Sequence, residues 1–207
     1  MTDTKKIGRP RNFDYDAALL KAMAVFWAKG FDGASLRDLT KAMGITGPSM
    51  YAAFGDKREL YLKTIDRYAD VDGCAPVVAF EAEPDIRKAV RGFLEEVILY
   101  ATENDSGAKG CFLASSVSTN IGQVEGVAER VEKAIEDTDK RLAARFDKEI
   151  EKGTLPPDFP SLDRAALLYD MRQGYMFRGR AGWRAEVLLQ GLDDRVEMIL
   201  AHKELRT

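Results

Sequence analysis

Two short apolar segments on either side of Gly44 are the feature that most constrains how this chain can fold. Residues 35–43 (SLRDLTKAM) and 48–54 (PSMYAAF) each have the length and apolar spacing of a two-turn helix. Glycine adopts the left-handed backbone that ends a helix at little cost, so Gly44 predicts a tight turn between them. Two short helices joined in this way predict a helix-turn-helix, whose second helix can enter a major groove.

Capping signals flank both segments. The Ser35 hydroxyl can cap the first helix, and Asp38 suits the positive end of that helix. Pro48 fits the first turn of the second helix, where its missing N–H costs nothing. Thr40 stands where this arrangement usually has Ala or Gly, so we expect a slightly looser contact between the two helices.

Helical periodicity continues through the rest of the chain, without a sustained period-2 alternation or an internal repeat. Gly and Pro residues divide the pattern, and residues 71–84 are interpreted as a linker. The expected helices cover residues 14–29, 35–43, 48–54, 56–70, 85–104, 111–121, 125–152, 162–178 and 184–202. The prediction is an all-α fold of about nine helices, with a basic arm over 1–12, a three-helix helix-turn-helix domain over 13–68 and a larger helical domain over 69–207.

Composition excludes several classes of protein. Hydrophobic residues make up 45% and charged residues 31% of the chain, which is typical of a soluble globular protein. The longest apolar run, residues 22–28, is too short to span a membrane, and the basic start MTDTKKIGRPR lacks the apolar core of a secretory signal. We therefore expect a cytoplasmic protein with no membrane partner.

Residues that carry catalytic or metal chemistry are scarce. The two cysteines, Cys74 and Cys111, are too few for a disulfide framework, and the single histidine, His202, offers no metal-ligand spacing. A phosphate loop, a nucleophile elbow and a paired acid–base motif are also absent. We expect no enzyme activity, no metal and no cofactor, and an enzyme or a helical scaffold protein is the competing interpretation.

The charge is distributed unevenly along the chain. Residues 1–68 hold 12 Lys and Arg against 8 Asp and Glu, whereas residues 69–207 hold 19 against 26. The net charge of −3 is therefore the sum of a basic head (residues 1–68) and an acidic body (residues 69–207). A basic head is what a nucleic-acid partner requires.

The stretch GFDGASLRDLTKAMGITGPSMYAAFGDKRELY resembles the DNA-binding domain of the TetR family of bacterial regulators, and GRPRNFD and AVFWAKG extend the likeness over residues 9–65. The remainder of the chain is similar only in layout, apart from the softer likeness of GCFLASS at residues 110–116. The characteristic residues of the family occur at matching positions: Phe26, Gly30, Ser35, Leu39, Gly44, Tyr51, Phe54, Lys57 and Leu60.

The resemblance implies a homodimer that binds a palindromic double-stranded DNA operator. The start of the second helix would read bases, with Met50 able to touch a thymine methyl. Phosphates would be contacted by the side chains that flank it, and two arginines of the arm would follow a groove or the backbone. Ala53 replaces a histidine common in the family, which removes one backbone contact. The expected DNA-binding residues are Arg9, Arg11, Ser35, Thr46, Gly47, Pro48, Ser49, Met50, Tyr51 and Lys57.

The resemblance also implies that the last two helices form the dimer interface and that a small hydrophobic effector binds between helices of the body. Each of these apolar residues could equally be core. The effector candidates are Phe93, Val97, Tyr100, Phe112, Tyr169 and Phe177, with Phe80 beside them. The dimer candidates are Leu167, Leu168, Met171, Tyr175, Val187, Leu188, Leu192, Val196 and Ile199.

The function implied is a transcriptional regulator, in most of the family a repressor, that an effector releases from its operator. Cys111 offers an alternative trigger. It follows Lys109 near the expected start of a helix, where a cation and the helix dipole would favour a thiolate that senses oxidants or electrophiles. The competing interpretation of Cys111 is a small, buried, inert residue.

Overall fold

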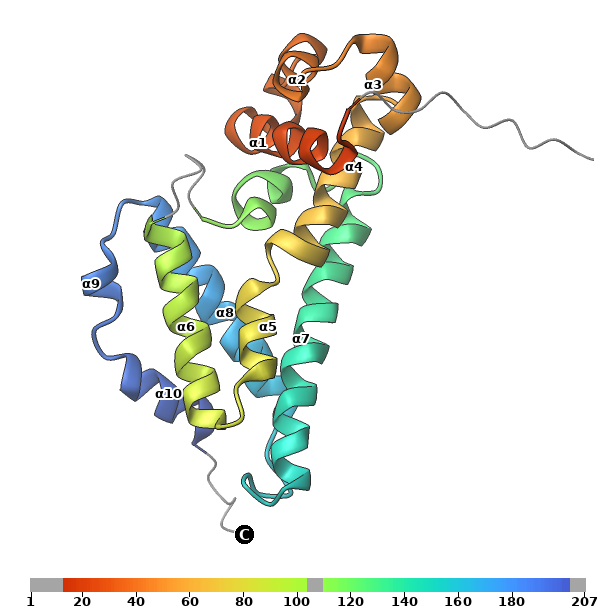
Figure 1. Cartoon of the computed structure of the whole chain (residues 1–207). Coiled ribbons are helices and arrows are strands. Elements are labelled where there is room, and N and C mark those ends of the chain that lie inside the picture. The colour runs from red at the N-terminus through yellow and green to blue at the C-terminus, as the bar shows by residue number, and fades with distance from the viewer. Residues whose placement is uncertain (1–12, 104–109, 202–207) are drawn as a thin grey trace, which may run out of the picture. The chain divides into compact units, whose positions relative to one another are not determined.

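The computed structural model describes residues 13–103 and 110–201, and all regular secondary structure within them is helical (Figure 1). Its ten α-helices, against the nine helices expected, confirm the predicted all-α fold. The chain divides into two compact units, one up to Thr64 and the other from Ile65 onward.

The first unit contains α1 (Tyr15–Gly33), α2 (Leu36–Met43), α3 (Gly47–Phe54) and the start of α4 (Lys57–Arg67). The Asp14 side chain caps α1 by accepting a hydrogen bond of 3.1 Å from the backbone N–H of Ala17. Gly30 has a φ of 71° and kinks α1, so the helix resumes beyond the residue where the sequence predicted its end. These helices share a fully buried core: Ala22, Phe26, Ala34, Leu39, Met50, Phe54, Leu60 and Tyr61.

The second unit begins within α4, which is followed directly by a π-helix, η1 (Tyr68–Asp72). It continues with α5 (Ala75–Ala82) and α6 (Ile86–Glu103). Residues 75–82 were expected to be a linker, and this expectation is wrong. Pro76 stands in the first turn of α5, where it is tolerated, and Val77 and Phe80 are buried by the same helix.

After residue 110 the chain forms η2 (Leu113–Val117), a π-helix, and η3 (Ser118–Asn120), a short 3₁₀ helix. A regular helix over 111–121 was expected. Hydroxyl groups instead bond to backbone carbonyls within the segment, for example Ser118 Oγ to Ala114 O at 2.7 Å. Such local bonds compete with the regular helical pattern.

The body is completed by α7 (Val127–Glu151), α8 (Ser161–Arg180), α9 (Ala185–Leu188) and α10 (Leu192–Leu200). One helix was expected over 184–202, but Gly191 has a φ of 67° and separates α9 from α10. The helices α5, α8, α9 and α10 pack against α6, and α7 packs against α8 (Figure 1).

Two close contacts organise this body. A Cβ added at Gly179 of α8 would lie 2.5 Å from the carbonyl oxygen of Ala101, so α8 passes α6 with no room for a side chain. On α7, Arg145 and Glu149 form a buried ion pair, and Arg145 Nη2 also donates to Glu83 O at 2.8 Å. The pair thereby ties α7 to the segment between α5 and α6.

Candidate nucleic-acid interface

The start of α2 is held by a capping box. Ser35 Oγ accepts a hydrogen bond from Asp38 N at 3.1 Å, and Ser35 N donates to Asp38 Oδ2 at 3.3 Å. Lys29 Nζ lies 2.9 Å from the same carboxylate. The Lys29 ammonium and the Ser35 hydroxyl and N–H lower the pKa of Asp38 to about 2. The cap is therefore anionic at neutral pH and draws α1 and α2 together.

The turn after α2 has the geometry that the sequence predicted. Gly44 adopts a left-handed φ of 70°, and its N–H donates to Lys41 O at 3.3 Å. The next N–H, of Ile45, donates to Thr40 O at 3.1 Å. Thr40 Oγ1 donates to Leu36 O at 2.8 Å, so the hydroxyl that departs from the usual Ala or Gly is satisfied within its own helix.

The first turn of α3 presents its hydroxyl groups as a pair. Thr46 caps the helix, with Oγ1 3.3 Å from Ser49 N and 2.9 Å from Ser49 Oγ. Pro48 stands in the first turn, as expected. Nothing lies within 4 Å of a Cβ built on Gly47, so the surface there is open to a close approach.

A surface groove of about 700 Å³ runs along this turn. Arg37 and Lys41 are exposed on α2, one helical turn apart, and both line the groove. Neither residue was among the predicted DNA-binding residues, although their i, i+4 spacing on a short helix was a usable signal. The full lining is Phe13, Arg37, Thr40, Lys41, Gly44, Ile45, Thr46 and Ser49. This basic groove therefore includes the Thr46–Ser49 hydroxyl pair.

The remaining DNA-binding candidates differ in exposure. The Tyr51 side chain is 50% exposed and available to a ligand. Met50 is fully buried, which corrects its expected contact with a thymine methyl, because it packs in the core of the first unit. Lys57 Nζ lies 4.5 Å from the centre of the Phe31 ring, a cation–π contact. Arg9 and Arg11 lie outside the described residues.

The effector candidates of the body do not line one pocket. Phe93, Val97 and Phe112 are fully buried, and Tyr169 is nearly so. Phe177 is 74% exposed, so its expected place in an internal pocket is corrected. Tyr100 is half-buried and borders a small cavity of about 20 Å³.

The dimer candidates separate into two groups. Most of them are buried within the single chain, whereas Leu167 and Met171 are half-buried and Val187 is exposed. Large apolar side chains that lie exposed on α8 and beyond it are Leu162, Phe177, Trp183 and Met198. The buried candidates are Leu168, Tyr175, Leu188, Leu192, Val196 and Ile199.

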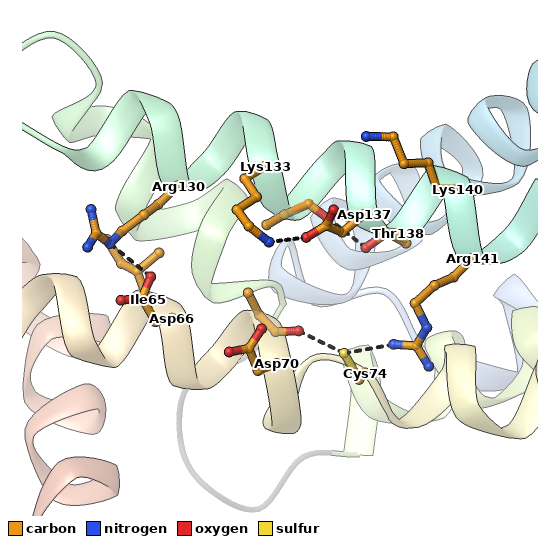
Figure 2. A pocket seen from close by; sticks show the side chains of 12 residues that line it. Ile65, Asp66, Asp70, Cys74, Arg130, Lys133, Asp137, Thr138, Lys140 and Arg141 are labelled. Atoms are coloured by element: carbon orange, nitrogen blue, oxygen red, sulfur yellow. Dashed lines mark hydrogen bonds and ion pairs between the residues drawn. The ribbon is translucent and has the colours of Figure 1, made fainter.

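A second groove, of about 670 Å³, lies between η1 and α7, and Figure 2 shows its charged walls. Arg130 Nε lies 2.8 Å from Asp66 Oδ1, and Lys133 pairs with Asp137. Cys74 Sγ donates to Ala69 O at 2.7 Å, and Arg141 Nη1 lies 3.4 Å from the sulfur. Charged side chains, most of them in ion pairs, wall this groove, unlike the aromatic effector pocket that was expected.

Within residues 13–103 and 110–201, no helix is long and apolar enough to cross a membrane. The same residues contain no cluster of three or more His, Cys, Asp or Glu side chains that could hold a metal ion.

Comparisons with known proteins agree with this description. Residues 18–64 match the family model of the bacterial regulatory proteins of the tetR family. The chain is 30% identical over 187 residues, 90% of its own length and 89% of the relative's, to the HTH-type transcriptional repressor ComR of Escherichia coli (strain K12). It is 27% identical over 168 residues, 81% of its length and 84% of the relative's, to the repressor BdcR of the same organism.

A solved structure of the TetR family regulator CifR, a cysteine mutant complexed with a 26 bp operator DNA, is similar with a TM-score of 0.79 and 31% identity. The match covers 93% of this chain and 98% of that one. Because the likeness to ComR and CifR extends over the body as well as the helix-turn-helix, it identifies the whole chain. The chain belongs to the TetR family of bacterial transcriptional regulators.

Proposed function

We propose that this protein is an operator-binding transcriptional repressor that a small effector releases from DNA. The observation that carries the proposal is the basic groove along the α2–α3 turn. It brings Arg37 and Lys41 beside the Thr46–Ser49 hydroxyl pair at the start of α3. Cations bind phosphates and set the register, while hydroxyl groups can donate to or accept from base edges.

The relatives support this function. CifR is solved on double-stranded operator DNA, and ComR and BdcR are named repressors. Ser35, Thr46, Gly47, Ser49 and Tyr51 are proposed to contact the operator. Pro48 is proposed to set the first turn of α3, and Lys57 to approach a phosphate from its place over Phe31.

A two-fold dimer is part of the proposal, because one helix-turn-helix makes too few contacts for tight specific binding. The exposed apolar side chains of Phe177 and Met198 are proposed to contact the partner subunit in the dimer interface. Leu167, Met171 and Val187 are proposed to join them there. The buried candidates of α8 and α10 would support this surface from inside the chain.

Release from DNA is proposed to follow a population shift. The effector would bind more tightly to a dimer conformation in which the two helix-turn-helix units are wrongly spaced for the operator. Operator affinity then falls according to the difference between the effector's affinities for the two conformations. The half-buried Tyr100 beside the small cavity of the body is the effector candidate with access to empty space.

The test is a fluorescence-anisotropy titration with the promoter region of the protein's own gene. We expect Arg37→Ala, Lys41→Ala and Tyr51→Ala each to weaken binding by about tenfold, and affinity to fall steeply with salt as counterions are released. The exposed Lys21→Ala variant on α1, outside the groove, is the matched control. An operator affinity that changes neither with salt concentration nor with any of the three groove substitutions would refute the repressor function.

A thiol trigger at Cys111 is a second candidate, favoured by the electrostatic interaction between Cys111 and the buried Arg172 guanidinium. Cys111 is only 1% exposed, so an electrophile would have to enter the core to reach it. If Cys111→Ser leaves release of DNA by quinones unchanged, this trigger is excluded.

A further inference from the structure

Arg172, near the centre of α8, is a buried cation that has no counter-ion within the part of the chain that the structure describes. Its residue is 4% exposed, and no carboxylate of the described residues forms an ion pair with it. Nη2 donates to Gly73 O at 3.1 Å, and the guanidinium lies 5.6 Å from the centre of the Tyr169 ring. Its Nε is buried and has no hydrogen-bond partner.

Two tyrosines near this guanidinium, Tyr68 and Tyr169, are neutral at physiological pH. Burial raises the pKa of Tyr68 well above its ordinary value, with the neighbouring Cys111 thiol acting in the same direction. Burial also raises the pKa of Tyr169 to about 12. Arginine stays charged in proteins, and a buried charge without a partner carries a large cost in desolvation. Packing does not account for an arginine at this position, because an apolar side chain of equal length would avoid that cost.

Empty space adjoins this charge. Arg172 lines the cavity of about 20 Å³, together with Gly73, Pro76, Tyr100 and Met176. A cavity of this size holds about one water molecule. A larger group can enter only if the segment around Gly73 and Pro76 moves outward.

We propose that Arg172 recognises the carboxylate of the effector, which is a small organic acid with an apolar body. The proposal rests on the proposed effector-released repressor and names the class of its ligand. A planar guanidinium matches a carboxylate through two parallel N–H···O bonds, and Arg172 Nε is a donor still free for such a pair. Pro76, Tyr100 and Met176 supply apolar surface for the body of the acid.

The arriving carboxylate would compete with Gly73 O for Arg172 Nη2. Gly73 N donates to Tyr68 O at 2.7 Å and so closes η1, which follows α4 without a break. Loss of the bond from Arg172 would free this end of η1 to shift. The effector thus acts on the chain segment that leads directly into the helix after α3.

Glu96 also lines the cavity and would oppose an anion there. Burial raises the pKa of Glu96, which weakens this opposition, and the carboxyl forms no ion pair with Arg172. Replacement by the isosteric amide therefore gives a second, independent variant. We expect Glu96→Gln to bind organic acids several-fold more tightly than the unchanged chain.

The experiment is isothermal titration of the full chain with acetate, hexanoate and benzoate, each compared with its amide. We expect at least one acid to bind and its amide to bind at least tenfold more weakly. Arg172→Met should lose that preference, whereas Arg178→Met, an exposed cation on the same helix, should keep it. Without an acid, Arg172→Met lacks the bond to Gly73 O and should therefore bind the operator more weakly than the unchanged chain, and it should melt at the same or a higher temperature.

Three results would overturn the inference: no acid of the series binds, acid and amide bind alike, or inorganic phosphate replaces the acid. Loss of acid binding in Cys111→Ser would also overturn the inference, because the role of Arg172 would then be to interact with the Cys111 thiol. If Arg172→Met does not fold, the inference is still tested by the comparison of each acid with its amide in the unchanged chain. The acid affinity of Glu96→Gln tests it as well. Failure of the unchanged chain to bind promoter DNA would refute the proposed repressor instead, since calorimetry measures acid binding without DNA.

Discussion

The hydroxyl groups of Thr46 and Ser49 lie 2.9 Å apart and hydrogen-bond to each other at the start of α3. The orientation of each hydroxyl group is therefore set by the other. The same Thr46 oxygen lies 3.3 Å from Ser49 N and caps the helix. The stability of the helix and the proposed contact with DNA consequently share one atom.

The first prediction separates these two roles. Thr46→Ala removes the cap and should lower the free energy of unfolding by about 1 kcal/mol, together with operator affinity. Thr46→Ser keeps the capping oxygen and should restore the stability. Urea denaturation and DNA titration of both variants measure the two effects. Equal stability of the Ala and Ser variants would show that the cap contributes nothing.

The second prediction concerns pH. Asp38 has a pKa of about 2 in the folded chain against an ordinary 3.8, because of Lys29 and Ser35. A lowered folded pKa means that the stabilisation is complete above the ordinary value and is lost as pH falls from about 4 toward 2. Asp38→Asn should remove this part of the acid sensitivity in urea midpoints between pH 2 and 7. Asp32→Asn, an exposed residue beside the α1–α2 junction, should leave it unchanged.

The third prediction concerns the buried pair on α7. Glu149→Ala would leave Arg145 without its buried carboxylate partner and should cost about 3–5 kcal/mol of unfolding free energy. The double variant Arg145→Met with Glu149→Leu removes both charges and should recover most of that loss. Thermal denaturation distinguishes the cases. A double variant as unstable as the single one would mean that the contacts to Glu83 and Pro84, not the charge, dominate.

The fourth prediction concerns self-association. Phe177→Asp places a charge on the most exposed apolar side chain of α8 and should convert the proposed dimer into a monomer. Val78→Asp, which changes an exposed valine on α5, should remain dimeric. Light scattering coupled to size exclusion measures both masses. An unchanged mass for Phe177→Asp would place the interface elsewhere.

The helix-turn-helix was predictable because its signals are local. Ser35, Gly44 and Pro48 each act on the backbone within one helical turn, so propensity and structure agree. The segment at residues 75–82 was not predicted as a helix, because Pro76 suggested a linker and the burial of Val77 and Phe80 depends on α6 and α7. That packing is invisible to a local pattern.

Side-chain exposure was the least predictable property of the site. Met50 and Tyr51 are neighbours on α3, yet one is fully buried and the other 50% exposed. Arg172 was not singled out at all, since an arginine in the middle of an amphipathic helix normally faces solvent. Only the structure shows that it lies against Gly73, a residue 99 positions away.

The absence of a side chain at Gly179 has a consequence for engineering this protein. Its α-carbon faces Ala101 across the crossing of α6 and α8, and Arg172 and Met176, which line the small cavity, stand on the same helix. Because no side chain fits at this crossing, the proposed acid site can be redesigned at other positions without altering the contact between the two helices. A library aimed at a changed response should therefore vary positions 76, 96, 100 and 176 and leave glycine at 179 untouched.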